Sequence, residues 1–136
     1  MVRRAGKAGA VVTGDELVAR AEAVAALAYA PYSNYLVGAT LLAKDGRVFD
    51  GVNVENAAYP LGVCAERTAI SKAASDGVRP GDLDAIGITA SPCGGCRQWL
   101  HEWRLERVYF RREDGSIADY APAGKLLPDT WNLPRS

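Results

Sequence analysis

The clearest helical pattern in the sequence lies near its start. Apolar residues recur at helical spacing from Leu17 to Ala30. Thr13 and Glu16 are spaced as a capping box, in which each side chain satisfies a free N–H group at the start of a helix. Pro31 disfavours a helical conformation in the residue before it. We therefore expect a helix that begins after Thr13 and ends at Pro31.

The rest of the chain alternates strand patterns with two further helical patterns. Apolar runs bounded by turn residues are expected to form strands. These runs are residues 36–43, 47–54, 82–89, 107–111 and 117–120. Residues 64–76 and a segment that opens at Pro92 are expected to form helices. Because helices and strands are interleaved, the pattern predicts an α/β fold of three layers, α/β/α, with a mixed sheet of roughly five strands.

Length and charge narrow the class of protein. A chain of 136 residues suits one domain, and we expect residues 13–136 to form it after a flexible N-terminal tail of residues 1–12. The formal net charge is zero, whereas nucleic-acid-binding proteins usually carry a basic excess. The basic start is not followed by an apolar run long enough for a signal peptide or a membrane span. We expect a cytoplasmic protein that binds neither nucleic acid nor membrane.

The residues that can carry chemistry are concentrated around three cysteines. Cys64 lies at the start of one predicted helix, and Cys93 and Cys96 lie at the start of another. Cysteines three residues apart share a face of a helical turn, so a thiolate from another element would complete a three-sulfur site. Three protein ligands leave one tetrahedral position of zinc open, which is typical of a catalytic ion. Glu66 supplies a carboxylate that could move protons close to such a metal.

Spacing alone leaves other interpretations of these residues open. Cys93 and Cys96 could form a redox dithiol at a helix N-terminus, where thiol pKa values fall. A structural zinc site would need a fourth ligand, but the single histidine, His101, is expected on another side of the helix, in solvent. Glu66 could be a first-turn acid favoured by the helix dipole. The presence of Cys64 beside Glu66 favours the metal interpretation.

Five separated motifs carry a resemblance to a known family. They are Pro31-Tyr-Ser, Asn53-Val-Glu55-Asn56, Cys64-Ala-Glu66-Arg67-Thr-Ala, Pro92-Cys93-Gly-Gly-Cys96-Arg97-Gln98 and Leu126-Leu-Pro128. In these motifs the chain resembles the small, homotetrameric, zinc-dependent cytidine deaminases, over residues 27–131. The resemblance implies a deaminase fold, a pyrimidine nucleoside as the small-molecule substrate, and a homotetramer, with a homodimer as the alternative.

The resemblance also implies a metal site and a mechanism. Cys64, Cys93 and Cys96 would bind one Zn²⁺ per subunit, with water as the fourth ligand. Glu66 would move a proton from that water to N3 of the cytosine ring while hydroxide attacks C4, and would then protonate the departing amino group. Cytidine and deoxycytidine would become uridine and deoxyuridine with release of ammonia, a reaction of pyrimidine salvage.

Substrate contacts are implied in the same way, and each has an ordinary structural alternative. Asn53 and Glu55 match residues that hold ribose hydroxyls, although polar residues that alternate along a strand are also typical of an exposed face. Ala65 matches a residue that meets the base through its backbone. Tyr35 matches an aromatic residue against the substrate, and Trp131 matches a C-terminal aromatic residue that reaches a neighbouring subunit's site. Tyr35 could instead be a core or interface aromatic residue, and Trp131 could instead be a plain surface anchor.

Arg67 adds a physical expectation. A divalent ion bound by three thiolates forms a site of net negative charge, which should weaken the attraction of the metal for its water. A guanidinium that donates a hydrogen bond to one sulfur would withdraw part of that charge and restore some of the acidity of the water. Close to the expected substrate, the chain departs from the family. Leu36 replaces a common proline, and only Thr89 and Ala90 separate a predicted strand from Ser91. These departures affect the expected substrate range more than the reaction type.

Three other functions stay open. Deamination of a modified cytosine nucleoside, such as blasticidin S, would use the same cysteines, although Asn53 and Glu55 favour an ordinary ribose. Editing of nucleic acid is disfavoured by the zero net charge. A CxxC thiol redox protein would turn over dithiols without zinc.

Overall fold

The computed structural model describes residues 2–3 and 11–134. Its helices are α1 (Gly14–Val24), α2 (Ala65–Ser75) and α3 (Gly94–Glu102). The main sheet contains β3 (Gly38–Ala43), β4 (Val48–Val52), β5 (Leu83–Ile88), β6 (Arg107–Arg111) and β7 (Ile117–Tyr120). The remaining described elements are β1 (Val2–Arg3), β2 (Val11–Val12) and the 3₁₀ helices η1 (Ala25–Leu27), η2 (Tyr59–Leu61) and η3 (Ala123–Leu126).

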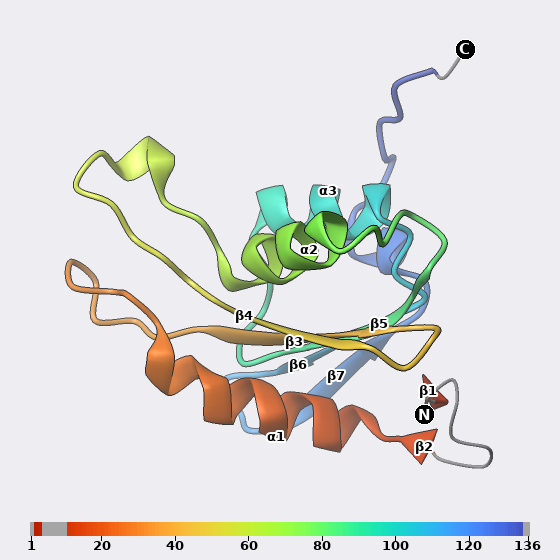
Figure 1. The fold of residues 1–136 in the computed structure, drawn as a ribbon, viewed down its shortest axis with the longest axis horizontal. Coiled ribbons are helices and arrows are strands. Elements are labelled where there is room, and N and C mark those ends of the chain that lie inside the picture. The colour runs from red at the N-terminus through yellow and green to blue at the C-terminus, as the bar shows by residue number, and fades with distance from the viewer. Residues whose placement is uncertain (1, 4–10, 135–136) are drawn as a thin grey trace.

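The main sheet is mixed and is covered on both faces. Its strand order is β4-β3-β5-β6-β7, in which β5 and β6 are parallel and the other neighbours are antiparallel. Helix α1 covers one face, and α2 and α3 cover the other (Figure 1). The predicted α/β/α fold with a mixed, five-stranded sheet is confirmed. None of the helices in the described residues has the length and apolar character that a membrane crossing requires.

Strand β3 connects the cores on the two faces. All six of its residues are buried. Leu41 belongs to the core beneath α2 and α3, and its neighbour Leu42 belongs to the core beneath α1, as alternation along a strand requires. Burial on both faces explains why this segment shows a continuous apolar run in the sequence.

Helix α1 is shorter than predicted. Thr13 caps it as expected, because its hydroxyl accepts a hydrogen bond from the N–H of Glu16 at 3.1 Å. The α-helix stops at Val24, however, and the backbone is extended at Ala28. The prediction that the helix reaches the proline is wrong because Tyr29 pairs instead with the chain that follows β4. This tertiary pairing outweighs the high helix propensity of the intervening alanines, because tertiary context routinely overrides intrinsic propensity.

Two segments, residues 28–37 and 53–63, project together past the end of the sheet, and we call them the arm (Figure 1). Val54 joins them through a bridge with Tyr29, and it also pairs with Val63 within its own segment. Strand β4 therefore ends before the predicted boundary. The polar residues that follow β4 belong to the arm and not to a regular strand.

The predicted N-terminal tail is only partly described. Strands β1 and β2 pair antiparallel, with Val2 opposite Val12. Val12 is 3% exposed and packs in the core beneath α1 with Leu17 and Tyr109. Contrary to prediction, Val12 is a core residue, because it directly precedes the cap of α1. Residues 4–10 lie outside the described residues, so a flexible tail remains a prediction there.

Helix α2 packs so closely on β4 that one strand position has no room for a side chain. A Cβ atom at Gly51 would lie 2.4 Å from the carbonyl oxygen of Ala65 and 2.5 Å from the amide nitrogen of Ala69. Glycine at this position lets the start of α2 rest directly on the sheet backbone. The contact fixes the height of the helix N-terminus, where Cys64 and Glu66 lie.

Candidate active site

The N-termini of α2 and α3 bring the three cysteines together. Cys64 is the N-cap residue of α2, and Cys93 is the N-cap residue of α3. Cys96 lies in the first turn of α3, and its N–H donates to Cys93 Sγ at 3.4 Å. The three Sγ atoms lie within 4.8 Å of one another. Two motifs that are far apart in the sequence therefore meet at one place.

This arrangement fits a zinc ion. Sulfurs bound at about 2.3 Å to a tetrahedral zinc lie roughly 3.8 Å apart, a spacing that these clustered thiols can adopt. Among the residues that the structure describes, the cluster consists of these three cysteines, which leaves one tetrahedral position open. His101 is engaged elsewhere, because its Nε2 is hydrogen-bonded with Asn132 Oδ1 at 2.8 Å near the other end of α3.

The surroundings of the sulfurs favour a thiolate. A hydrogen bond shared with Cys96, reinforced by Arg67, lowers the pKa of the Cys64 thiol to about 5 in spite of partial burial. The same shared hydrogen bond, together with burial and the carboxyl of Glu66, raises the pKa of Cys96. Without a metal, the ionised form of one thiol is therefore favoured at the expense of the other. A bound cation would favour the thiolate form of both, because it stabilises every coordinating sulfur as a thiolate.

Arg67 contacts the cluster from the first turn of α2. Its Nη2 donates to Cys64 Sγ at 3.3 Å, which is the kind of contact expected from the sequence. Its Nε is buried and has no hydrogen-bond partner within the described residues. A guanidinium beside three sulfurs suits a site whose ligands carry excess negative charge.

Glu66 lies on the same helix and is turned into the protein. The residue is 3% exposed, and burial raises the pKa of its carboxyl, as does negative charge on Cys64. Together with Cys64 and Cys93, it lines one cavity. A carboxyl whose pKa is raised towards the working pH can both accept and donate a proton.

The cavity beside the sulfurs has a volume of about 200 Å³. Three of the predicted substrate contacts, Tyr35, Asn53 and Ala65, line it. The lining residues that the sequence did not assign are Val37, Ile88, Ala90 and Ser91. Ile88 ends β5, and Val37 directly precedes β3. The place of Ile88 at the carboxyl end of a strand was the available signal, because ligands in such sheets bind there. Val37 lies at the same edge of the sheet because β3 runs antiparallel to β5.

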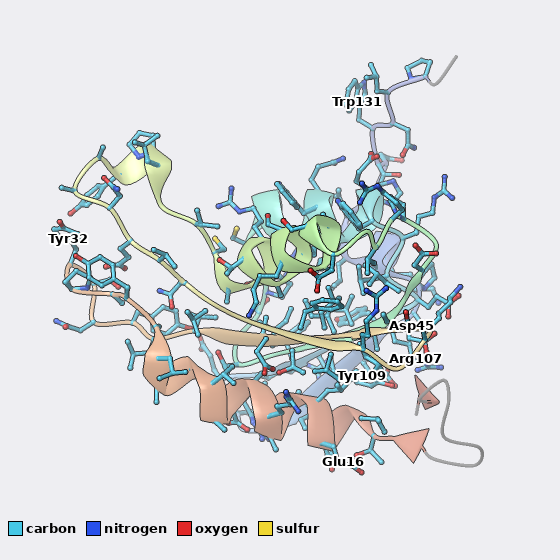
Figure 2. All side chains as sticks on the ribbon, viewed as in Figure 1. Glu16, Tyr32, Asp45, Arg107, Tyr109 and Trp131 are labelled. Carbon is cyan, nitrogen blue, oxygen red and sulfur yellow. The ribbon has the colours of Figure 1, made fainter. Side chains whose placement is uncertain are left out.

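Two predicted substrate contacts lie outside this cavity. Glu55 lines a separate cavity of about 360 Å³ in the arm, together with Tyr32 and Ser33. Trp131 is 66% exposed on the C-terminal segment, which extends away from the sheet and helices (Figure 2). Within one subunit, neither residue is placed beside the sulfurs.

Comparison with known families agrees with this geometry. The family model of the cytidine and deoxycytidylate deaminase zinc-binding region matches residues 12–112, a range that contains the three cysteines and Glu66. The chain belongs to this family. As in the rest of this deaminase family, the cofactor is zinc, and the clustered thiols of Cys64, Cys93 and Cys96 are able to hold it.

Similar deaminases match most of the chain. The cytidine deaminase of Sporosarcina psychrophila is 42% identical over 126 residues, covering 87% of this chain and 90% of that protein. The cytidine deaminase of Mycobacterium tuberculosis H37Rv is 43% identical over 126 residues, covering 90% and 92%. The crystal structure of cytidine deaminase from Burkholderia pseudomallei, 43% identical, matches with a TM-score of 0.81 and covers 88% of this chain and 100% of that one.

Proposed function

We propose that this deaminase converts cytidine and deoxycytidine to uridine and deoxyuridine by hydrolysis, with release of ammonia, in pyrimidine salvage. The observation that carries the proposal is the buried carboxyl of Glu66 in the same cavity as the sulfurs of Cys64 and Cys93. The small, largely apolar cavity suits a flat pyrimidine ring. The similar proteins are themselves named cytidine deaminases, which supports the same substrate class.

The residues of the site divide the work of the reaction. When bound, zinc supplies Lewis acidity, which brings the pKa of water in its open position to about 7. Glu66 takes a proton from the attacking water and delivers it to N3 of the ring, which makes C4 more electrophilic. Glu66 next takes the remaining proton from the new hydroxyl group on C4 and passes it to the amino group, so that ammonia leaves as the carbonyl of uridine forms. One water is consumed for each ammonia released.

Three residues that line the cavity are proposed to position the substrate. Tyr35 contacts the ring, the backbone of Ala65 meets the base, and Asn53 faces the ribose. Ala65 begins α2, and the free N–H groups of that first turn can stabilise negative charge that develops on the ring.

Turnover of cytidine by the purified, zinc-loaded protein tests the proposal, with uridine and ammonia measured together. Glu66→Gln is expected to keep its zinc and to lose turnover by roughly 10²- to 10⁴-fold, the usual contribution of general acid–base catalysis. Glu106→Gln is the matched control, because Glu106 pairs with Lys44 at the surface at 3.1 Å. Zinc-loaded protein that deaminates neither cytidine nor deoxycytidine would refute the substrate assignment.

A modified cytosine nucleoside is a second candidate substrate. Tyr35, Ala90 and Ser91 line both the cavity beside the sulfurs and a second, larger cavity of about 720 Å³. Because the connection between β5 and Ser91 is short, a bulky group on the nucleoside has space to extend into this larger cavity. A higher kcat/KM for blasticidin S than for cytidine would favour this candidate.

We propose that the protein is a homotetramer, with a homodimer as the alternative. Many large apolar side chains are exposed together on the arm, and monomeric proteins rarely expose large apolar patches. They are Tyr29, Tyr32, Tyr35, Leu36, Val54, Tyr59, Leu61 and Val63. A second copy packed on the arm would remove them from water, and the exposed Trp131 would be free to reach a neighbouring subunit's site. Light scattering that finds only monomers would contradict this proposal.

We also propose a cytoplasmic location. The three cysteines are not paired in disulfides in the structure, and such cysteines are typical of a reducing compartment. Activity that appears only in a secreted fraction of the source cells would contradict it.

A further inference from the structure

Cys93 is the most accessible of the three cysteines in the metal site. It is exposed, whereas Cys64 is half-buried and Cys96 is buried. The two residues that follow it, Gly94 and Gly95, carry no side chain that could shield its sulfur. Cys93 also lines the cavity that a substrate has to enter. A molecule much smaller than a nucleoside can therefore reach this sulfur.

The hydrogen bonds of the cluster compensate the charge on Cys93 less than the charge on Cys64. The cationic guanidinium of Arg67 donates to Cys64 Sγ at 3.3 Å. Cys93 Sγ instead accepts a hydrogen bond from an uncharged group, the N–H of Cys96, at 3.4 Å. Hydrogen bonds from ionised donors are roughly twice as strong as those from neutral donors. The exposed sulfur is therefore also one that keeps more of its negative charge and nucleophilicity.

Cys96 is placed to form a disulfide with Cys93. Cys93 is the N-cap residue of α3 and Cys96 lies in its first turn, so one helical turn carries both thiols. The N–H of Cys96 holds the Cys93 sulfur over that turn, and the Sγ atoms lie within 4.8 Å of one another. Cys-x-x-Cys pairs at a helix N-terminus are the arrangement that disulfide oxidoreductases open and close.

Cys64 is a poorer partner for Cys93. A bond between these two cysteines would join two helices, and it would convert the thiolate that Arg67 pairs with into an uncharged disulfide sulfur. The guanidinium would then lose this partner, although its Nε is already buried without one among the described residues. Buried donors that are left unsatisfied cost free energy. A bond within α3 leaves the contact between Arg67 and Cys64 in place.

We propose that hydrogen peroxide oxidises Cys93 and Cys96 to a disulfide, which releases the zinc and switches the enzyme off reversibly. An accessible thiolate next to a second cysteine that can resolve it is the arrangement of redox-sensor cysteines. The inference needs only the metal site, so it holds whichever nucleoside is the substrate. It assigns a regulatory modification to the deaminase and not a second enzymatic activity.

The oxidation proceeds in two steps. The Cys93 thiolate attacks one oxygen of the peroxide, so an S–O bond forms, the O–O bond breaks, and the departing hydroxide takes up a proton to become water. The Cys96 thiolate then attacks the sulfur of this sulfenic acid, so an S–S bond forms, the S–O bond breaks, and a second hydroxide leaves as water. Two thiolates lose two electrons, and one peroxide with two protons becomes two waters. Only Cys64 is then left to coordinate zinc.

Zinc release from the wild-type holoenzyme tests the proposal without relying on activity. Hydrogen peroxide is added in the presence of a zinc-chelating dye, and the remaining thiols are counted. One zinc is expected to be released for every two thiols lost, and turnover should be lost in parallel. Dithiothreitol followed by zinc should restore both the thiols and the turnover. Zinc that stays bound after the thiols are lost would overturn the proposal, and so would thiols that dithiothreitol cannot recover.

Two variants form a matched pair that tests the choice of partner. Cys64→Ser and Cys96→Ser each keep Cys93 and one other thiol, and both are oxidised without zinc. Cys64→Ser is expected to lose both thiols to a disulfide. Cys96→Ser is expected to keep the Cys64 thiol and to accumulate the sulfenic acid of Cys93, which dimedone labels. A disulfide that forms equally fast in both variants would overturn the proposal.

Peptide mapping of the oxidised wild type decides the same question if either variant fails to fold. Trypsin cleaves after Arg67 and after Arg97, so Cys64 lies in one peptide and Cys93 lies with Cys96 in another. The expected disulfide closes a loop within the second peptide and leaves the Cys64 peptide free. Oxidised protein in which the two peptides are linked to each other would contradict the proposal.

Discussion

Arg67 Nη2 donates to Cys64 Sγ at 3.3 Å, from three residues further along the same chain segment. The segment that presents one of the three sulfurs therefore also supplies a compensating positive charge. Three thiolates bring more negative charge than a divalent ion neutralises, and a cationic hydrogen bond to sulfur offsets part of the excess.

Arg67→Gln is expected to keep zinc bound while turnover falls roughly 10- to 100-fold, the usual effect of removing a group that hydrogen-bonds a metal ligand. The remaining thiolates hold the ion, but their uncompensated charge weakens its pull on water. Metal analysis and kcat measured on one preparation check this, with Arg67→Lys expected to be intermediate. Unchanged turnover in Arg67→Gln would contradict the role of the charge.

Arg97 ties the loop before α3 to the C-terminal part of the fold. Its Nε donates to the carbonyl of Pro92 at 2.9 Å, its Nη1 to the carbonyl of Leu126 at 3.0 Å, and its Nη2 to Ser91 Oγ at 3.0 Å. Because Cys93 directly follows Pro92, these contacts hold the backbone that presents a sulfur.

Arg97→Gln is therefore expected to weaken zinc affinity by roughly 10-fold, at the lower end of the range for residues that support metal ligands. Competition with a zinc-chelating dye measures the effect. Arg79→Gln is the matched control, because Arg79 also donates to backbone carbonyls, those of Ala74 and Val78, away from the cysteines. Equal zinc affinity in the two variants would show that the contacts of Arg97 do not support the site.

Asp50 links α1 to the sheet and predicts a dependence of stability on pH. Its carboxylate accepts hydrogen bonds from Arg20, the shortest at 2.9 Å, and from the hydroxyl of Thr40 at 2.9 Å. Partial burial would raise the pKa of Asp50, but these hydrogen bonds outweigh burial and lower it. The stabilisation is therefore fully present above the unfolded-state pKa of about 3.9 and is lost as pH falls through the lower folded-state pKa.

Asp50→Asn is expected to lower the free energy of unfolding by about 1 kcal/mol at pH 7, the value of one partly exposed charged contact. The difference from wild type should narrow below about pH 4, where the unfolded carboxylate becomes protonated. Urea unfolding at pH 7, 5 and 3 measures it, with Asp119→Asn as an exposed control that pairs with Arg107. A difference that stays constant down to pH 3 would rule out the ionised carboxylate as its source.

Gly51→Ala is expected to destabilise the fold by about 1–3 kcal/mol, because overpacking forces the backbone to shift. The added Cβ would meet the backbone of α2, so zinc content should fall as well. Gly94→Ala, where a Cβ would meet nothing within 4 Å, is the control and should be tolerated. Chemical denaturation and metal analysis check both variants; wild-type stability of Gly51→Ala would mean that α2 can move without cost.

The sequence predicted the order of the elements and the sheet well, because those depend on local apolar patterns and turn residues. It failed at the end of α1, where alanines favour a helix but Tyr29 pairs with Val54, a residue distant in the chain. A long-range backbone pairing of this kind has no local signal. Val12 was misjudged for a related reason, since its burial depends on packing against Tyr109 from β6.

In the candidate site too, residues with a local sequence signal could be placed, and those that depend on long-range contacts could not. Cys64, Cys93 and Glu66 could be placed because each sits within a short motif at the start of a helix. The place of Glu55 could not be predicted, because its partners in the arm lie more than twenty residues earlier and sequence spacing does not show which way a loop side chain turns. Resemblance supplied a role for Glu55, and the structure supplies its contacts.

The close packing of α2 on β4 at Gly51 also limits which parts of this enzyme can change to accept other substrates. Helix backbone meets sheet backbone at Ala65, which lines the cavity, and such a contact cannot be enlarged or reduced one methyl group at a time. Residues 32–37 and the short connection before Ser91 lie outside the helices and strands, so their side chains can change without moving that backbone contact. Laboratory evolution toward larger nucleosides should therefore accumulate changes in those two loops, while the reaction centre beneath them stays the same from one variant to the next.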